Sequence, residues 1–282
     1  MSSINVADDV KLYKRISNLN DCNDLQLALN KLSGWCSENR LELNTNKCRV
    51  LSFTRKSTYI RNDYRINTTV LTRVHSICDL GVTFCNDLKF NEHISATSGK
   101  AVRTLGFLLR NCKEFRSTST LRQIYISLVR PIMEYATVIW APSSSCSINT
   151  MENVQRRLMK FIHFRNTGCY PPRGYPNDLL LTETKLGSLE TRRKYFDALF
   201  GTNVINNTTE CGALLEHINF RIPRASSRNR DIFYIGTNRT CAKQDSTVSR
   251  ICRELNAISE DIDISRVTKG DLRKIYLTYS IN

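Results

Sequence analysis

The sequence lacks the features that would mark a membrane, secreted or zinc-binding protein. No stretch approaches the roughly 20 apolar residues of a membrane-spanning helix, and no apolar signal run stands near the start of the sequence. None of the eleven cysteines is spaced as Cys-x-x-Cys, and no group of cysteines and histidines has zinc-finger spacing. These absences predict an intracellular protein with reduced thiols, without a membrane partner or a disulfide-linked partner. Nuclear and cytoplasmic locations stay equally open.

Acidic residues are scarce relative to basic ones. The 282 residues include 41 lysines and arginines but 26 aspartates and glutamates, so the net charge is +15. A surplus of this sign favours a polyanionic partner, with nucleic acid first and an anionic membrane surface second. The alternative is an ordinary basic protein whose charges are solvated.

The sequence also offers no convincing nucleophile for covalent catalysis. Such catalysis needs a nucleophile and a base within hydrogen-bonding reach of each other. The four histidines, His75, His93, His163 and His217, are isolated in sequence from one another. We expect each of them to be structural.

The N-terminal part of the chain has a mixed pattern. Two short apolar segments within Ile4–Tyr13 flank the acidic pair Asp8–Asp9, which fits a β-hairpin with the acids at its corner. A helix with Asp21 or Asn23 as its cap is predicted next. The predicted segments are a helix over 21–40 and strands over 48–53, 64–70 and 79–84. Together they predict an α+β region over residues 1–91.

From about residue 92 the pattern becomes helical. Apolar residues recur every three or four positions, and Pro131 should kink or break the longest run. The chain is thus divided into a helical region over 92–168, a proline-rich linker over 169–178, and a tail over 179–282. The tail is helical to about residue 200 and weakly patterned beyond it. About two domains fit this length, since domains average roughly 150 residues.

The pair Asp8–Asp9 raises the question of a metal site. Carboxylates that converge at a hairpin corner can hold Mg²⁺, which prefers oxygen ligands. Two such ions can drive phosphoryl or nucleotidyl transfer. Two adjacent aspartates alone are a weak signal, because aspartate is common in turns.

The surrounding sequence gives this pair a context. VADDVKLYKRI resembles the catalytic aromatic-Ala-Asp-Asp box of reverse transcriptases from non-LTR, LINE-type (jockey-like) retrotransposons. Later segments resemble the parts of these enzymes that follow the box, from the strand near the primer grip through the thumb to the C-terminal tail. In family order they are LQLALNKLSGWCSENRLELNTNKCRVLSF, CDLGVTF, KAVRTLGFLLR, LRQIYISLVRPIMEYATVIWAP, MENVQRRLMKFI, LGSLETRRKYFDALF and FRIPRASSRNRDIF. Each segment alone is weakly specific, while the ordered set covers nearly the whole chain.

The resemblance implies a polymerase palm remnant, made of hairpin, helix and strands, followed by a mostly helical thumb and tail. The family activity is RNA-directed DNA polymerisation, a nucleotidyl transfer that uses Mg²⁺, dNTPs, an RNA template and a DNA primer. Asp8 would be a Mg²⁺ ligand, and Asp9 would support the same site. Lys47 would assist the departure of pyrophosphate, and a solvated turn lysine explains it equally well. Val6 departs from the family's aromatic residue, but either residue type suits a strand.

The family's third catalytic aspartate, on an earlier palm strand, has no counterpart in this sequence, and neither do the fingers. The resemblance therefore implies a 5′-truncated reverse transcriptase that is inactive alone. The alternatives are a non-catalytic nucleic-acid-binding module derived from such an element and a fragment without a function of its own. We also expect the first 15 residues to be poorly anchored, because an isolated hairpin is marginal. The helical region from about 92 to 165 should be better packed.

Basic residues are concentrated in the helical region. Between residues 100 and 165, eleven basic residues stand against three acidic ones, a difference of +8. Helices with a basic face opposite an apolar stripe suit a phosphate backbone, here the RNA/DNA duplex that a thumb would track; an ordinary solvated face is the alternative. The predicted nucleic-acid-binding residues are Lys100, Arg103, Arg110, Arg156, Arg157 and Lys160. Tyr125, Tyr135 and Trp140 could stack on bases, but their apolar neighbours favour core positions.

Overall fold

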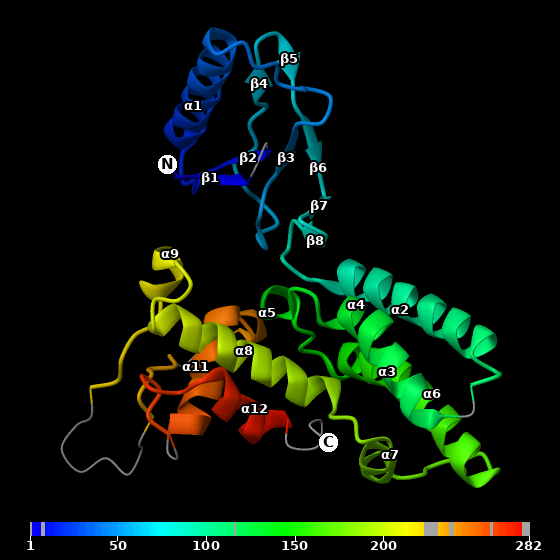
Figure 1. Ribbon diagram of the computed structural model, residues 1–282. Coiled ribbons are helices and arrows are strands. Elements are labelled where there is room, and N and C mark those ends of the chain that lie inside the picture. Colours follow the sequence, from blue (N-terminus) through cyan, green and yellow to red (C-terminus); the bar gives the residue numbers. More distant parts are fainter. Residues whose placement is uncertain are drawn as a thin grey trace. The chain divides into compact units, whose positions relative to one another are not determined.

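Two compact units make up the chain (Figure 1). The structure is a computed structural model, which describes residues 2–6, 9–115, 117–222, 231–236, 240–259 and 262–277. The N-terminal unit is Met1–His93 and the helical unit is Ile94–Asn282. All the named strands belong to the N-terminal unit, whereas the helical unit is built mainly from helices. The chain is therefore an α+β protein, as the sequence predicts.

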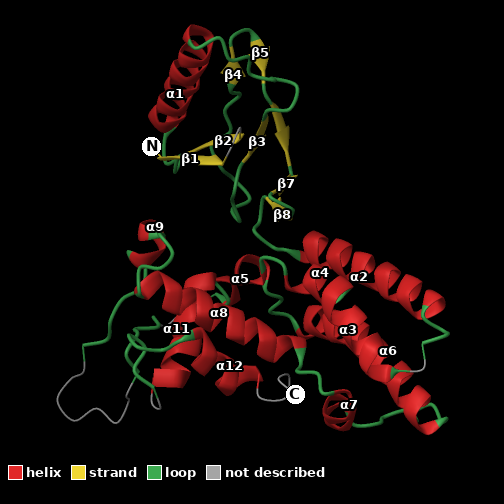
Figure 2. Cartoon of the chain, viewed as in Figure 1, coloured by secondary structure: helices red, strands yellow, loops and turns green. Residues whose placement is uncertain are grey.

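The N-terminal unit consists of one long helix and four pairs of short strands (Figure 2). The predicted hairpin is confirmed by β1 (Ser2–Val6) and β2 (Asp9–Tyr13), which pair antiparallel with Val6 opposite Asp9. β3 pairs in parallel with β6, and the antiparallel pairs β4–β5 and β7–β8 complete the unit. The bounds are β3 Arg49–Leu51, β4 Arg65–Ile66, β5 Thr69–Val70, β6 Thr72–Val74, β7 Ser76–Asp79 and β8 Val82–Cys85.

Two of the predicted strands are interrupted by turns. The strand predicted over 64–70 is wrong at its centre, because Asn67 turns the chain with φ +52° and separates β4 from β5. The strand predicted over 79–84 is likewise divided, since Leu80 and Gly81 have φ values of +46° and +81°. Two consecutive positive φ values are typical of the tight turns that join antiparallel strands. Each prediction thus becomes a hairpin rather than one strand.

The helix α1 (Leu19–Glu38) begins earlier than the sequence predicts. Asn18 is its N-cap, and its side chain accepts a 3.0 Å hydrogen bond from the backbone N–H of Asp21. The Asp21 carboxylate accepts a bond from the N–H of Asn18 in return, which completes a capping box. The predicted caps Asp21 and Asn23 are therefore wrong, because Asp21 is the third helical residue of this box.

The core of the N-terminal unit is small. A cluster of three buried residues lies between the apolar face of α1 and the β4–β5 hairpin. It comprises Tyr64, Ile66 and Leu71, with Leu25, Leu29, Leu43, Cys48 and Val50 packed against it. Because hydrophobic stabilisation scales with buried apolar area, this cluster contributes little stabilisation to the unit.

The helical unit contains the remaining helices, and α2 (Asn91–Asn111) leads into it. The long run predicted around Pro131 is broken twice, first at Val129 just before the proline and again at Ala136, whose φ is +54°. The bounds are α3 Thr118–Leu128, α4 Arg130–Glu134, α5 Thr137–Trp140, α6 Ser145–Thr167, α7 Asn177–Thr184, α8 Leu189–Ile205, α9 Gly212–Leu215, α10 Cys241–Gln244, α11 Thr247–Ser259 and α12 Lys269–Leu277.

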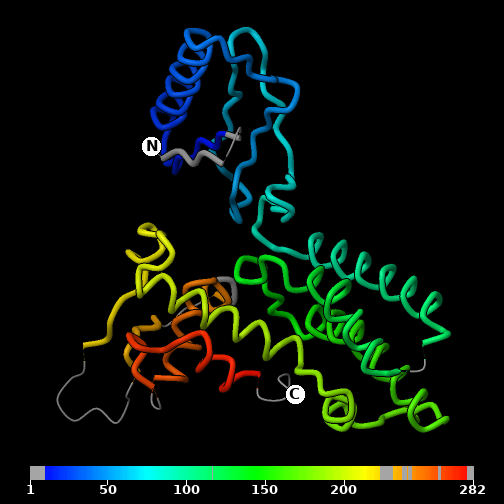
Figure 3. Tube along the Cα trace, in the orientation of Figure 1, coloured from blue at the N-terminus to red at the C-terminus, as the bar shows by residue number. Residues whose placement is uncertain are grey.

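The tail beyond residue 201 is more ordered than its weak pattern predicts. Helices α11 and α12 both pack against α8, as the trace in Figure 3 shows. Gly201 allows the close approach of α8 and α11, because a Cβ there would overlap Cγ2 of Ile251 and lie 3.1 Å from Cδ1 of Leu255. The cluster around these helices includes the fully buried Ala198, Ile251, Leu255 and Leu272. The C-terminal helices therefore form an apolar cluster with α8.

Candidate nucleic-acid interface

The residues proposed for catalysis are not brought into a site by the described part of the chain. Asp8 lies outside the described residues, and Asp9 begins β2 with its side chain likewise outside the description. Lys47 is exposed in a turn, where its backbone N–H donates a 3.0 Å bond to the carbonyl of Asn44. Among the described side chains, no group of three or more His, Cys, Asp and Glu residues could hold a metal ion. Magnesium therefore stays a prediction of the sequence resemblance.

One ion pair joins strand β2 of the hairpin to strand β7, which lies in the segment that resembles the primer-grip region. Lys11 of β2 lies 2.7 Å from the carboxylate of Asp79 in β7, and β2 also contacts α1. Both side chains are about one-third exposed, so this pair contributes roughly 0–1 kcal/mol. The hairpin thus has partners in its own unit.

Three of the predicted nucleic-acid-binding residues lie on one exposed stripe of α2. Lys100, Arg103 and Arg110 are exposed, and their spacings of three and seven residues place them on the same helical face. Phe107 lies between the two arginines on this face and is 62% exposed. The one acidic residue of α2 is Glu92, in its first turn. We call these four residues, Lys100, Arg103, Phe107 and Arg110, the basic stripe.

Glycines shape this stripe. A Cβ at Gly99 would lie 3.4 Å from Nη1 of Arg103, and one at Gly106 would lie 3.3 Å from Nη1 of Arg110. Each guanidinium therefore lies back along the helix over the glycine four residues before it. Glycine inside a helix costs roughly 0.5–1 kcal/mol of stability relative to alanine. The repeated Gly-x-x-x-Arg spacing therefore marks Arg103 and Arg110 in the sequence in a way that their charge alone does not.

The two arginines repeat after about two turns of α2. Seven residues of an α-helix rise about 10.5 Å, so Arg103 and Arg110 offer two separated positive charges on the same face.

The predicted nucleic-acid-binding residues of α6 are Arg156, Arg157 and Lys160, and two of them contact the segment that follows this helix. Arg156 donates a 2.8 Å bond from Nη2 to the carbonyl of Tyr175, and Nζ of Lys160 lies 6.0 Å from the centre of the Tyr170 ring. These contacts attach the segment after α6 to the helix. Arg157 is exposed and makes no hydrogen bond or ion pair among the described residues. Of the three residues, Arg156 is the one whose side chain is held by a hydrogen bond, whereas Arg157 and Lys160 make no hydrogen bond or ion pair among the described residues.

Other arginines of the helical unit are held in buried ion pairs. Arg192 of α8 donates two hydrogen bonds to the carboxylate of Glu134 in α4, and the bond from Nη2 is 2.9 Å long. Nε of Arg130 lies 3.6 Å from the same carboxylate. Burial lowers the pKa of Arg130. These cations stabilise the contact between α4 and α8 and are not free to bind phosphate.

A second buried carboxylate caps the start of α8. Glu152 of α6 accepts hydrogen bonds from the backbone N–H groups of Leu189 and Glu190, at 3.3 and 2.8 Å. These groups are unpaired at the start of a helix and attract negative charge. Burial raises the pKa of Glu152, and the two backbone bonds together with Arg193 act in the opposite direction.

The aromatic residues divide between core and surface. Tyr125 and Trp140 are fully buried, which confirms their predicted core positions. Tyr125 donates a 2.9 Å hydrogen bond to Gln155, and burial raises its pKa well above the usual range. Tyr135 is 57% exposed, so its predicted core position is wrong, because the chain turns at Ala136.

Comparisons with known proteins assign no family to the chain. No family model, no curated protein and no solved structure matches it. Within the part of the chain that the structure describes, none of the helices has both the length and the hydropathy required to cross a membrane. The resemblance to reverse transcriptases therefore stands as an interpretation of the sequence.

Proposed function

We propose that the helical unit binds nucleic acid through the basic stripe of α2 and does so without catalysis. The observation that carries this proposal is the exposure of three cations and one aromatic ring on a single helical face. Lysine and arginine neutralise phosphates and release counterions, which supplies sequence-independent affinity. An exposed aromatic side chain between them offers a surface on which a base can stack.

We further propose that this module derives from a non-LTR retrotransposon reverse transcriptase. The order of the resembling segments supports this origin, and so does the hairpin formed by β1 and β2 at the Ala-Asp-Asp segment. The ligand would then be an RNA template paired with a DNA primer, and Mg²⁺ and dNTPs would belong to the parent activity. The distinct alternative is catalysis by this chain with a metal at Asp8 and Asp9.

The binding proposal is tested by titrating a labelled RNA/DNA hybrid with the purified full chain and recording fluorescence anisotropy at several salt concentrations. Loss of three phosphate contacts should reduce the slope of log K against log salt by about 2 to 3 units. The stripe variant carries Lys100→Gln, Arg103→Gln and Arg110→Gln.

A matched control removes the same charge from another exposed surface of the helical unit. It carries Arg266→Gln, Lys269→Gln and Arg273→Gln. We expect the control to keep most of the affinity and the stripe variant to lose about tenfold or more at low salt. Equal loss in the two variants would show that net charge, rather than the stripe, governs binding.

The catalytic alternative is tested by primer extension on an RNA template with Mg²⁺ and dNTPs. The wild-type chain should extend no primer while it still binds the hybrid. Extension that disappears in an Asp8→Ala variant would contradict the proposal of a non-catalytic module and would assign the acidic pair a role in nucleotidyl transfer.

A further inference from the structure

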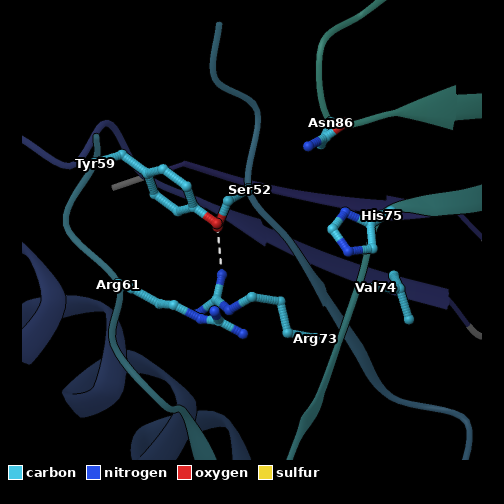
Figure 4. Close-up of a pocket in the computed structure, with 7 residues that line it drawn as sticks. All are labelled: Ser52, Tyr59, Arg61, Arg73, Val74, His75 and Asn86. Atoms are coloured by element: carbon cyan, nitrogen blue, oxygen red, sulfur yellow. Dashed lines mark hydrogen bonds between the residues drawn. The ribbon is translucent and has the colours of Figure 1, made fainter. Parts of the chain in front are cut away.

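We infer that the N-terminal unit holds a binding site for a phosphate monoester, in a hollow beside the parallel strands β3 and β6 (Figure 4). The hollow is formed by residues that follow β3 and β8, by the loop before β4, and by β6 with the residue after it. Its polar lining consists of Ser52, Tyr59, Arg61, Arg73, His75 and Asn86. We call it the arginine hollow.

Arg73 is fixed in position on the wall of this hollow. Its Nη1 donates to the hydroxyl of Ser52, and its Nη2 donates to the backbone carbonyl of Asn62. Its Nε is buried and has no hydrogen-bond partner among the described residues. A buried donor without a partner is costly, and an acceptor supplied by a ligand would remove that cost.

Arg61 brings a second positive charge to the same place. Figure 4 shows the side chains of Arg61 and Arg73 pointing toward one another, one from the loop and the other from β6. Arg61 makes no ion pair or hydrogen bond among the described residues, and no acidic residue lines the hollow. Like charges disfavour each other at close range unless a counter-charge lies between them. Arg192 and Arg193 of the helical unit are buried beside such carboxylates, whereas the exposed Arg61 and the partly buried Arg73 have none.

The chemistry of the lining selects the class of ligand. Arginine presents a planar fork of donors that matches phosphate oxygens. A phosphate monoester carries about −1.5 to −2 charges at pH 7, which balances two guanidinium groups better than the single charge of a diester. Hydroxyl groups from Ser52 and Tyr59 and the amide of Asn86 supply further donors, whereas Val74 is the one apolar residue of the lining.

The size of the hollow limits the ligand to a small group. Its cavity volume is about 80 Å³. This value is well below the roughly 300–1,000 Å³ of small-molecule pockets. A single phosphate, either free or at the end of a longer molecule, fits this description. The inference goes beyond the proposed function, because none of these residues belongs to the basic stripe.

Inorganic phosphate is the first probe, titrated into the full chain at constant ionic strength and followed by ³¹P NMR line broadening. We expect saturable binding that Arg61→Gln weakens about tenfold. Arg61 is exposed and makes no hydrogen bond or ion pair among the described residues, so this variant should fold normally. Arg15→Gln is the matched control, since Arg15 is exposed and lies outside the hollow. Absence of saturable binding, or equal binding by the wild-type chain and Arg61→Gln, would overturn the inference.

A second arm identifies the source of the phosphate. Two oligonucleotides of one sequence, with a 5′-phosphate or a 5′-hydroxyl, are compared on the stripe variant so that α2 does not mask the result. Tighter binding of the phosphorylated strand, lost in Arg61→Gln, supports a strand terminus as the ligand. Equal binding of the two strands, with inorganic phosphate still bound, supports free phosphate. If the basic stripe did not bind nucleic acid, the phosphate titration and the comparison of the two oligonucleotides would still test the hollow.

Discussion

The two units differ in the partners of their arginine side chains. In the helical unit, the buried Arg192 pairs with Glu134, and the partly buried Arg250 pairs with Asp197. In the N-terminal unit, Arg73 is held by a hydroxyl and a carbonyl and faces a second arginine. The paired charges join one helix to another, whereas the two arginines of the hollow have no described carboxylate beside them.

The units also differ in their apolar cores. The helical unit buries large side chains completely, among them Trp140, Tyr125 and Phe233. The N-terminal unit has a cluster of three buried residues, a few further buried side chains such as Cys22 and Val82, and short strand pairs. We therefore expect the helical unit to have the larger free energy of unfolding, and three predictions test this comparison.

The largest effect is expected when the buried ion pair of the helical unit is broken. Glu134→Gln leaves Arg192 and Arg130 without their carboxylate in a site where both are mostly buried. Removal of one partner from a buried pair costs about 3–5 kcal/mol. Chemical denaturation of the helical unit, followed by circular dichroism at 222 nm, measures this loss.

The control for this prediction lies on the surface of α8. Glu190 and Lys194 form an exposed pair four residues apart, with side chains about half exposed. Glu190→Gln should change the free energy of unfolding by about 0.5 kcal/mol or less. Similar losses from Glu134→Gln and Glu190→Gln would show that the buried network adds nothing beyond surface charge.

A pair of glycine substitutions should act in opposite directions in the two units. Gly201→Ala places a methyl group against Ile251 and Leu255 at the contact of α8 with α11, and such overpacking costs about 1–3 kcal/mol. Gly34→Ala in α1 meets nothing within 4 Å and should stabilise the N-terminal unit by about 0.4–1 kcal/mol. Amide hydrogen exchange of each unit measures both changes, and a stabilising Gly201→Ala would contradict the close helix contact.

The smallest effect is a pH dependence in the N-terminal unit. His93 is buried, which lowers its pKa from 6.5, and its Nδ1 accepts a 3.2 Å hydrogen bond from the N–H of Thr83. The unfolded chain therefore binds a proton at a higher pH than the folded chain does. This contribution to stability is complete above pH 6.5 and is lost as the pH falls from 6.5 through the lowered pKa.

The protection factor of the Thr83 amide, measured from pH 7.5 to 5 and corrected for intrinsic exchange, follows this change. Protection should fall with decreasing pH in the wild-type chain. In a His93→Gln variant, which carries no titrating group at this position, the trend should disappear. An unchanged trend in the variant would assign it to another group.

Local signals in the sequence predicted part of the fold well. Helical spacing located α2, α3 and α6, and Pro131 marked a real break. The turns at Asn67 and Leu80 were missed because a positive φ at a non-glycine residue leaves little trace in an apolar pattern. Helix α11 was missed even though Ile251, Leu255 and Ile258 recur at helical spacing, because the polar residues between them obscured the stripe.

The candidate interfaces were predictable to different degrees. Lys100, Arg103 and Arg110 follow from charge and helical period, and the structure adds Phe107 together with the glycines beneath the arginines. The arginine hollow could not be predicted, since Arg73 meets Ser52 across 21 positions of sequence. Such a meeting depends on the parallel pairing of β3 with β6, which short-range patterns do not specify.

The sequence by itself determined the sign of the net charge, because this is a sum over the composition. It also determined the helical period and the spacing of the stripe, because these depend on residues within a few turns of one another. The tertiary structure decided which cations are free. Arg192 reaches Glu134 across 58 positions and is thereby used for stability. Arg61 makes no described ion pair or hydrogen bond and stays available to a ligand. Composition cannot make this distinction, because only packing brings distant carboxylates to some arginines and leaves others without one.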